Sequence, residues 1–288
     1  MDDLAAGGVS LDRPRPAAAP KADFPYWLVA LALVATSAAV TIAADDLYSQ
    51  IFATVIQGIW ITVYVTLVGF TLASLLGLCI ALMSLSGSMW LRQVARFYVE
   101  ICRGIPFLVL LFWIAFAGVP VFVTTWNSLT SPLRDAGLLG ELQVRDVSFL
   151  WRAVIALTIG YAAFIAEVFR AGIQSVDGGQ IEAAKALGLS RWQRFRLVVF
   201  PQAMRTILPP LGNDFVTMVK DSSFVSVLGV ADITQLGKVY SAGTFRFFET
   251  YSIVAYIYLM LTIGLSLALR GLEARLRRQQ SHRQEAAG

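Results

Sequence analysis

The side chains of this chain that could do chemistry are suited to binding rather than to catalysis. Its single histidine, His282, lies in a polar C-terminal tail, and the sequence has no Ser/His pair, HExxH motif or carboxylate dyad. Cys79 and Cys102 lie in apolar segments without the paired spacing of a disulfide framework or a metal site. We therefore expect no catalytic centre and no metal ion.

Charged residues recur three positions apart inside otherwise apolar segments. Glu100 is followed by Arg103, and Glu167 by Arg170. Residues three apart are neighbours on a helix, so each pair can form a local ion pair. The alternative is a gate contact that changes when the protein moves.

A third polar group follows a proline pair. Asn213, Asp214 and Thr217 come directly after Pro209-Pro210 and Gly212, in a segment that is otherwise mostly apolar. Prolines remove backbone hydrogen bonds, which predicts a broken helix here. Such breaks are tolerated where the backbone lines a cavity or is buried in protein. The polar residues therefore either line a path or bond one helix to another.

The composition places these residues in a membrane. The 288 residues are 57% hydrophobic and 15% charged, whereas soluble domains have about 25% charged residues. Several apolar runs exceed the roughly 20 residues that a spanning helix needs. The predicted fold class is an all-α polytopic membrane protein with about six spans, near residues 27–44, 54–86, 97–123, 149–169, 203–225 and 251–269.

The second span is the ambiguous one, because no charged residue occurs between Leu47 and Leu91. That length suits either one long tilted helix or a hairpin. A hairpin would place the arginine-rich segment 179–201 outside, against the positive-inside rule. We therefore predict one long helix and both termini in the cytoplasm.

This topology divides the chain into four parts. Residues 1–25 are a predicted disordered cytoplasmic leader, and residues 26–46 an N-terminal span. Residues 47–272 form the main transmembrane domain, with an external insert at 124–148. Residues 273–288 are a basic cytoplasmic tail.

The segment 179–201, "GQIEAAKALGLSRWQRFRLVVFP", is the most distinctive cytoplasmic one. Residues 180–187 predict a helix that Gly188 ends, and Ser190 with Gln193 has the spacing of a capping box that starts another. Pro201 is expected to stop that second helix. Trp192 and Phe195 share one face, and basic residues another. Physically, the segment suits a groove on another protein or an anionic lipid surface equally well.

The same segment resembles the EAA signature of ATP-binding-cassette (ABC) importer permeases. Glu182-Ala183-Ala184, then Gly188, then Val198-Val199-Phe200-Pro201 fit its spacing, with Val198 and Phe200 as apolar exchanges. "VEICRGIPFLVLL", "AAFIAEVFRAGIQSV" and "KDSSFVSVLGV" resemble the polar-amino-acid branch of these permeases, over about residues 51–278. The first span, the insert and Asp177-Gly178 depart from that pattern.

The resemblance implies a type I ABC importer transmembrane domain, five core spans plus one, in a bacterial cytoplasmic membrane. It implies that segment 179–201 couples to a cytoplasmic ABC ATPase dimer through Glu182, Ala183, Ala184, Gly188, Arg191, Trp192, Arg194, Phe195 and Pro201. A second permease chain, identical or a sibling, and an extracytoplasmic solute-binding protein are the other implied partners, beside membrane lipid. Nucleic acid is not expected.

Function follows as transport of a polar amino acid, not enzymatic catalysis. The sequence has no Gly-x4-Gly-Lys-Ser/Thr loop, so we expect ATP to be bound by a partner subunit and the chain itself to need no cofactor. The predicted path or gate residues are Glu100, Arg103, Glu167, Arg170, Asn213, Asp214 and Thr217. The alternative function is an ion-driven secondary transporter, which would favour inverted repeats that the sequence lacks.

Overall fold

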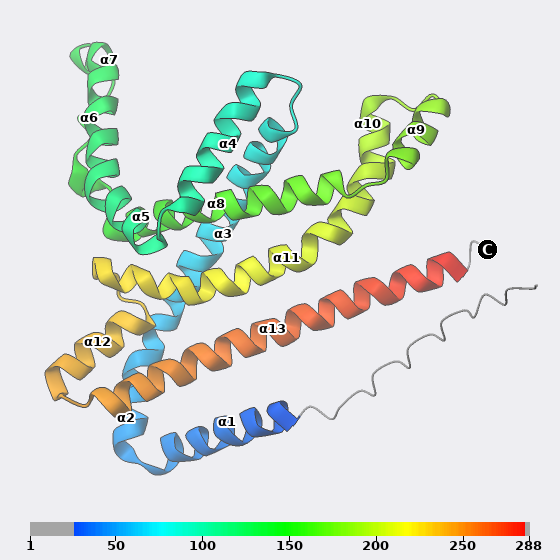
Figure 1. Cartoon of the computed structure of the whole chain (residues 1–288). Coiled ribbons are helices and arrows are strands. Elements are labelled where there is room, and N and C mark those ends of the chain that lie inside the picture. Colours follow the sequence, from blue (N-terminus) through cyan, green and yellow to red (C-terminus); the bar gives the residue numbers. More distant parts are fainter. Residues whose placement is uncertain (1–25, 286–288) are drawn as a thin grey trace, which may run out of the picture.

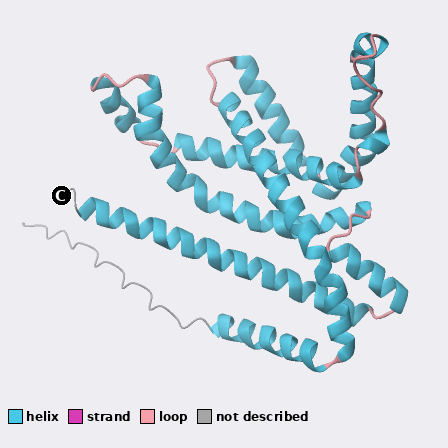
Figure 2. Cartoon of the chain, turned by 180° about the vertical axis from the view of Figure 1, so that it is seen from behind, coloured by secondary structure: helices cyan, strands magenta, loops and turns pink. Residues whose placement is uncertain are grey.

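The computed structural model describes residues 26–285, and every regular element within them is a helix (Figures 1 and 2). The predicted leader, residues 1–25, lies outside the described residues, as do residues 286–288 and most side chains beyond residue 272. This all-α architecture confirms the predicted fold class.

The longer helices are α1 (Tyr26–Ala44), α2 (Asp46–Val55), α3 (Ile59–Ser84), α4 (Met89–Gly104), α8 (Phe149–Gln174), α11 (Phe200–Asp221), α12 (Ile233–Thr244) and α13 (Phe247–Glu285). The shorter ones are α5 (Phe107–Trp113), α6 (Val119–Leu129), α7 (Ser131–Asp135), α9 (Gly178–Ala186) and α10 (Arg191–Arg194). Between them lie the 3-10 turns η1 (Ile56–Gly58), η3 (Val144–Asp146) and η5 (Ser222–Leu228), and the π turns η2 (Ile114–Gly118) and η4 (Phe195–Val199).

The long uncharged segment is one helical rod and not a hairpin, as predicted. α2, η1 and α3 follow one another without a break and form a single span of 39 residues, Asp46–Ser84. An all-round apolar helix of this length exceeds the bilayer thickness and therefore has to tilt or protrude.

α8 lies at the centre of the bundle. In its most apolar window 61% of the residues are buried, against none in α1. Glycines let its neighbours approach closely: a Cβ on Gly77 of α3 would lie 2.9 Å from Ile165, and a Cβ on Gly160 would lie 3.1 Å from Phe107. α8 therefore holds α3 and α5 through backbone-close packing.

The third predicted span, 97–123, is wrong as a single helix. α4 ends at Gly104, and the next helical segment begins at Phe107 and runs through η2 to Leu129. Pro106 causes the break, because its ring disfavours helical geometry at the preceding residue, and Ile105 is indeed extended (φ −94°, ψ 129°).

The fifth span was also expected to be broken, and it is not. α11 is helical through Pro209 and Pro210, although neither supplies an N–H to the turn before it. Five helices of the described chain are long and apolar enough to cross a membrane. α11, which carries Arg205, Asp214 and Lys220, is not among them. It corresponds to the predicted fifth span, 203–225, and would bring the total to six.

Both ends of the described chain lie on the outside of the bundle (Figure 1). α1 packs mainly on α2 and α13, and none of its residues is buried. α13 continues past the predicted domain boundary at residue 272 and reaches Glu285. The basic tail therefore starts as an extension of the last helix, because no proline follows the boundary and Gly271 stays helical.

The predicted external insert is folded onto the bundle by one buried arginine. Arg152, only 7% exposed, donates from Nε to the carbonyl oxygen of Val147 (2.8 Å), from Nη1 to that of Ala115 (2.9 Å) and from Nη2 to that of Val144 (2.6 Å). Its guanidinium carbon also lies 4.8 Å from the centroid of the Phe149 ring. These contacts tie η3 and the π turn η2 to the start of α8.

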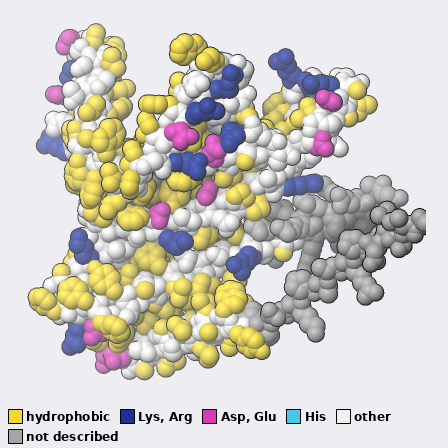
Figure 3. All heavy atoms as spheres, in the orientation of Figure 1, with side chains coloured by type: hydrophobic (Ala, Val, Ile, Leu, Met, Phe, Trp, Pro, Cys, Tyr) yellow, Lys and Arg dark blue, Asp and Glu magenta, His cyan; other side chains and the backbone are white. Residues whose placement is uncertain are grey.

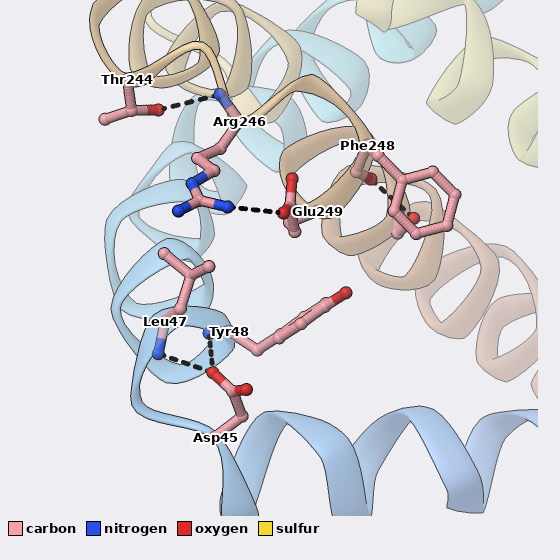
Figure 4. A network of polar contacts seen from close by, with 8 residues as sticks. Asp45, Leu47, Tyr48, Thr244, Arg246, Phe248 and Glu249 are labelled. Carbon is pink, nitrogen blue, oxygen red and sulfur yellow. Dashed lines mark hydrogen bonds and ion pairs between the residues drawn. The ribbon is translucent and has the colours of Figure 1, made fainter.

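Two helix turns meet at the far end of the bundle (Figure 4). Asp45 caps α2 by accepting from the N–H groups of Leu47 (2.8 Å) and Tyr48 (3.3 Å). In the α12–α13 turn, Arg246 forms an ion pair with Glu249 at 3.3 Å. Because this pair is largely exposed, it contributes little, of the order of 0–1 kcal/mol.

The junction of α3, α12 and α13 is polar and buried. Asp232 caps α12 by accepting from the Gln235 N–H (2.8 Å), and it also accepts from the Tyr258 hydroxyl (3.1 Å). Burial raises the pKa of the Asp232 carboxyl, and these hydrogen bonds offset part of that rise. Gly58 lies directly against the backbone of Asp232 and Ile233.

We predict that Gly58→Ala destabilises the protein, because the added Cβ would clash with the backbone of Asp232 and Ile233. Overpacking of this kind costs about 1–3 kcal/mol. The matched control is Gly243→Ala on α12, where a Cβ meets nothing within 4 Å and alanine is the better helix former. Thermal unfolding in detergent should show a lower midpoint for the first variant only. Equal midpoints for both would contradict the close packing.

Candidate functional site

The two predicted charge pairs line one pocket between the end of α3, α4 and α8. This α4–α8 pocket has a volume of about 530 Å³ and is lined by Ser84, Arg92, Gln93, Arg96, Val99, Glu100, Arg103, Glu167, Arg170 and Gln174. Figure 3 shows charged side chains of both signs gathered over α4 and α8, between apolar surfaces. The pocket is thus a polar cavity in an apolar protein.

The two pairs differ in geometry. Arg170 holds Glu167 with two hydrogen bonds, from Nη2 to Oε2 (2.6 Å) and from Nε to Oε1 (3.2 Å), and donates to Gln174 (2.8 Å). Glu100 and Arg103 form no ion pair among the described residues. The Arg103 guanidinium carbon lies instead 5.7 Å from the centroid of the Phe164 ring on α8, one turn before Glu167.

One face of α4 lines the pocket, and it is mostly cationic. Arg92, Arg96, Glu100 and Arg103 recur on that face at helical spacing. The opposite face, with Ala95, Val99 and Cys102, is buried. Arg92 is held by the α3–α4 loop, where its Nη1 donates to the carbonyl oxygens of Ser86 (2.9 Å) and Gly87 (2.8 Å). Arg96 has no hydrogen bond or ion pair within the described chain.

A second polar group lies on α11, where the sequence placed Asn213, Asp214 and Thr217. Thr217 donates to the carbonyl oxygen of Asn213 (3.0 Å), an intrahelical bond. The Asp214 Oδ2 atom is buried and has no partner within the described chain. Of the three residues, only Asp214 has a buried acceptor that is left open.

Sequence reasoning missed the hydrogen-bond partner of Asp221, which follows Asp214 by seven residues on α11. The Tyr161 hydroxyl on α8 donates to Asp221 Oδ2 (2.7 Å). Asp221 forms no ion pair with the adjacent Lys220 within the described chain, and Lys220 lines a different pocket beside α1 and α13. The seven-residue spacing of Asp214 and Asp221, two helical turns, could have placed both acids on one face.

The segment 179–201 forms two short helices at an angle (Figure 1). Asp177 caps the start of α9, accepting from the Gly179 N–H at Oδ1 (2.6 Å). The helix ends at Ala186, and Gly188, with a left-handed φ of +74°, follows as its C-terminal cap. The Leu189 N–H reaches the Ala184 carbonyl oxygen (3.1 Å), as in a Schellman motif. The structure therefore contains the predicted glycine cap.

The second helix begins as expected but does not end at Pro201. Ser190 and Gln193 form the capping box, with bonds of 2.9 and 3.3 Å. The rings of Trp192 and Phe195 stack with centroids 5.9 Å apart. α10, η4 and α11 then follow one another without a gap, so the helix continues through Pro201. A π turn just before the proline absorbs its missing N–H.

Spanning helices, a polar internal pocket and a basic segment with exposed aromatic rings define a polytopic membrane transport subunit. The chain belongs to the family described as binding-protein-dependent transport system inner membrane component, whose profile matches residues 69–278. It is therefore the permease of an ABC importer, a transport subunit and not an enzyme, and the stated resemblance is confirmed.

Individual relatives agree with this assignment. The chain is 34% identical over 222 residues to the glutamine transport system permease protein GlnP of Escherichia coli, covering 77% of this chain and 92% of the relative. It is 34% identical over 216 residues to the probable amino-acid permease protein YxeN of Bacillus subtilis, covering 75% and 88%. It is 36% identical over 213 residues to the octopine transport system permease protein OccM of Rhizobium radiobacter, covering 74% and 81%.

Solved structures support the fold. A crystal structure of an amino acid ABC transporter with histidines matches with a TM-score of 0.66 and 37% identity, over 81% of this chain and 98% of that one. An inward-facing MetNI methionine ABC transporter matches with a TM-score of 0.57 and 20% identity, over 77% and 95%. The second likeness concerns the fold alone.

Proposed function

We propose that this permease carries a polar amino acid or an amino-acid derivative across the bacterial cytoplasmic membrane, powered by a separate ATPase docked on segment 179–201. Relatives named for glutamine, octopine and arginine transport support this substrate class. The observation that carries the proposal is the polar α4–α8 pocket inside an apolar protein. The buried, unpartnered Asp214 and the capped helices of segment 179–201 support it.

The substrate path combines one acidic and one basic region. Asp214, with Asp221 and Tyr161 beside it, offers an acceptor to the ammonium group of an amino acid. Arg103 and the unpaired Arg96 in the α4–α8 pocket offer donors to its carboxylate. Asn213 and Thr217 lie on the same helix as Asp214 and belong to the proposed path. Glu100, Glu167 and Arg170 belong to the gate, in which Glu167 can exchange Arg170 for Arg103.

The docking segment consists of α9, α10 and η4. Trp192 is 67% exposed in this chain, and Leu197 62%. Glu182, Ala183, Ala184, Arg191, Arg194 and Phe195 complete the surface around Gly188 and Pro201. Ala184 is buried, so its small side chain permits close packing of α9 and does not itself contact a partner.

The assembly contains two permease chains, an ATPase dimer that binds ATP, and an external solute-binding protein. One chain supplies one docking segment and one half of a two-sided gate, so a second chain, identical or homologous, completes both. The termini are cytoplasmic, because the basic residues around Lys185, Arg191 and Arg275 then lie inside. Residues 26–46 are an added span at the edge of the 47–272 domain.

We predict that uptake into proteoliposomes requires the cognate ATPase and ATP. The sequence carries no phosphate-binding loop, so the chain has no means of its own to use nucleotide. Vesicles with permease, ATPase and external binding protein should accumulate labelled amino acid only when ATP is supplied. Uptake driven by an ion gradient without nucleotide would identify a secondary transporter and refute the proposal.

Gly188→Ala should uncouple the ATPase while leaving the transmembrane helices folded, because alanine strains the left-handed cap that sets the angle between α9 and α10. Gly137→Ala is the matched control. Gly137 has a similar φ of +71°, against +74° for Gly188, and in both cases a Cβ meets nothing within 4 Å. Both variants should lose about 1 kcal/mol of stability.

Only Gly188→Ala should lower binding-protein-stimulated ATP hydrolysis, by about tenfold. Equal hydrolysis rates in the two variants would remove segment 179–201 from the coupling mechanism.

Asp214→Asn should reduce uptake and raise stability together. The amide lacks the charge that attracts an ammonium group, so kcat/KM for uptake should fall at least about tenfold. Without substrate the same change replaces a buried, unpartnered carboxylate by a neutral amide, which costs less to bury than a charge, so the unfolding midpoint should rise, by about 1 kcal/mol in free energy. The exposed Asp135→Asn is the control and should change neither. A destabilised Asp214→Asn with normal uptake would show a structural role.

A further inference from the structure

The two π turns of the described chain have the same construction. In η2 the Val119 N–H reaches back five residues to the Ile114 carbonyl oxygen, and Pro120 follows. In η4 the Phe200 N–H reaches back five residues to the Phe195 carbonyl oxygen, and Pro201 follows. Each turn therefore lies immediately before a residue that has no N–H to donate.

This construction leaves one carbonyl oxygen open in each turn. In a regular helix the Val119 N–H would bond to Ala115, and the Phe200 N–H to Arg196. Both N–H groups are engaged one residue earlier, and the next position in each case is a proline. The carbonyl oxygens of Ala115 and Arg196 thus have no intrahelical donor.

The chain satisfies the first of these oxygens and not the second. Arg152 donates to the Ala115 carbonyl oxygen at 2.9 Å from a buried position. No side-chain hydrogen bond of the described residues ends on the Arg196 carbonyl oxygen. Its neighbours are exposed apolar residues, Leu197 at 62% and Phe200 at 48%. An acceptor surrounded by such residues loses its water when a partner covers it.

We propose that the π turn Phe195–Val199 is a binding element, which presents the Arg196 carbonyl oxygen to a hydrogen-bond donor of the ATPase. This rests on the proposed docking of segment 179–201 on that subunit. Pro201 is then a positioning residue that keeps the acceptor open. Arg152 at η2 is the intramolecular example of the same contact.

The charges around η4 define the donor further. Segment 179–201 carries four basic residues, Lys185, Arg191, Arg194 and Arg196, and one acid, Glu182. A cationic donor would be repelled by these side chains, so the donor is uncharged: a serine or threonine hydroxyl, an asparagine or glutamine amide, or a backbone N–H. The groove around it is acidic.

The test is Pro201→Ala, which supplies the missing N–H. The helix can then return to its regular pattern, in which Phe200 bonds to Arg196 and the acceptor is closed. Affinity of the nanodisc-embedded permease for the ATPase should fall about five- to tenfold, because a donor in the groove is left unpaired. Pro120→Ala is the matched control and should not change this affinity, since Arg152 already occupies its acceptor. Pro201→Ser, which supplies the same N–H, should repeat the loss.

A double-mutant cycle then identifies the donor. Serine, threonine, asparagine and glutamine side chains of the ATPase groove are replaced by alanine one at a time. One of them, or none if the donor is a backbone N–H, should weaken binding to the wild-type permease and not to Pro201→Ala. Unchanged affinity of both Pro201 variants overturns the inference while the proposed function stands. Failure of the wild-type permease to bind any ATPase refutes the proposed function itself.

Discussion

A backbone carbonyl oxygen that has lost its donor finds no water in the hydrocarbon of a membrane, and this constraint shapes the structure at Pro106 and Pro120. At Pro106 the chain ends α4 and starts a new helix. At Pro120 it widens into a π turn, and Arg152 supplies the missing donor from the next helix. The same guanidinium holds the predicted external insert, through the carbonyl oxygens of Val144 and Val147.

The same constraint is met differently at Pro201. Pro201 lies where segment 179–201 leaves the bundle, and the oxygen that its π turn opens is not met by the chain itself. Pro209 and Pro210 remain inside α11, directly before Asp214. Prolines are therefore concentrated on the one helix that joins the docking segment to the acid group. A helix weakened at two points between these sites can bend there when either end moves.

α8 connects the same functions by a second, more rigid route. It carries Tyr161 beside the α11 acids and Glu167 with Arg170 in the α4–α8 pocket, and it leads through residues 175–177 directly into α9. At the C-terminal end of α8 the Ser175 hydroxyl bonds to Thr206 on α11 (3.1 Å). Only the short turn at residues 175–177 separates α9 from the helix that carries the pocket pair. In the proposed coupling, α8 is therefore a second route from α9 to the pocket, beside the one through Pro209 on α11.

The parts that sequence reasoning predicted are those that depend on local chemistry or on membrane topology. The Gly188 cap and the Ser190 capping box follow from residue types at fixed offsets, and the single helix Asp46–Ser84 follows from the positions of basic residues. The wrong predictions concern helix ends, because the three-dimensional packing and not the local sequence decides whether a helix stops at a proline. Pro201 predicts an end to a helix, and only the three-dimensional backbone shows that a π turn carries the helix past it.

Side-chain partners were harder to predict for the same reason. The spacing of Glu100 and Arg103 matches that of Glu167 and Arg170, yet only the second pair forms, because Arg103 has an aromatic ring of α8 within reach. Lys220 and Asp221 are adjacent in sequence, but successive helical residues point about 100° apart, and Asp221 faces Tyr161. A charge pair read from sequence is thus conditional on what the neighbouring helix offers.

Two buried charges of this permease, Arg152 and Asp214, differ in how completely they are hydrogen-bonded within the chain. Arg152 is almost fully buried, and each of its three nitrogens donates to a backbone carbonyl oxygen, so its charge is held by the fold. Asp214 is less buried, and one of its oxygens has no donor in the chain. An open buried acceptor costs about 1–3 kcal/mol. In the proposed substrate path, the ammonium group of the passing substrate would supply the donor, and the cost carried by the empty protein would then favour binding.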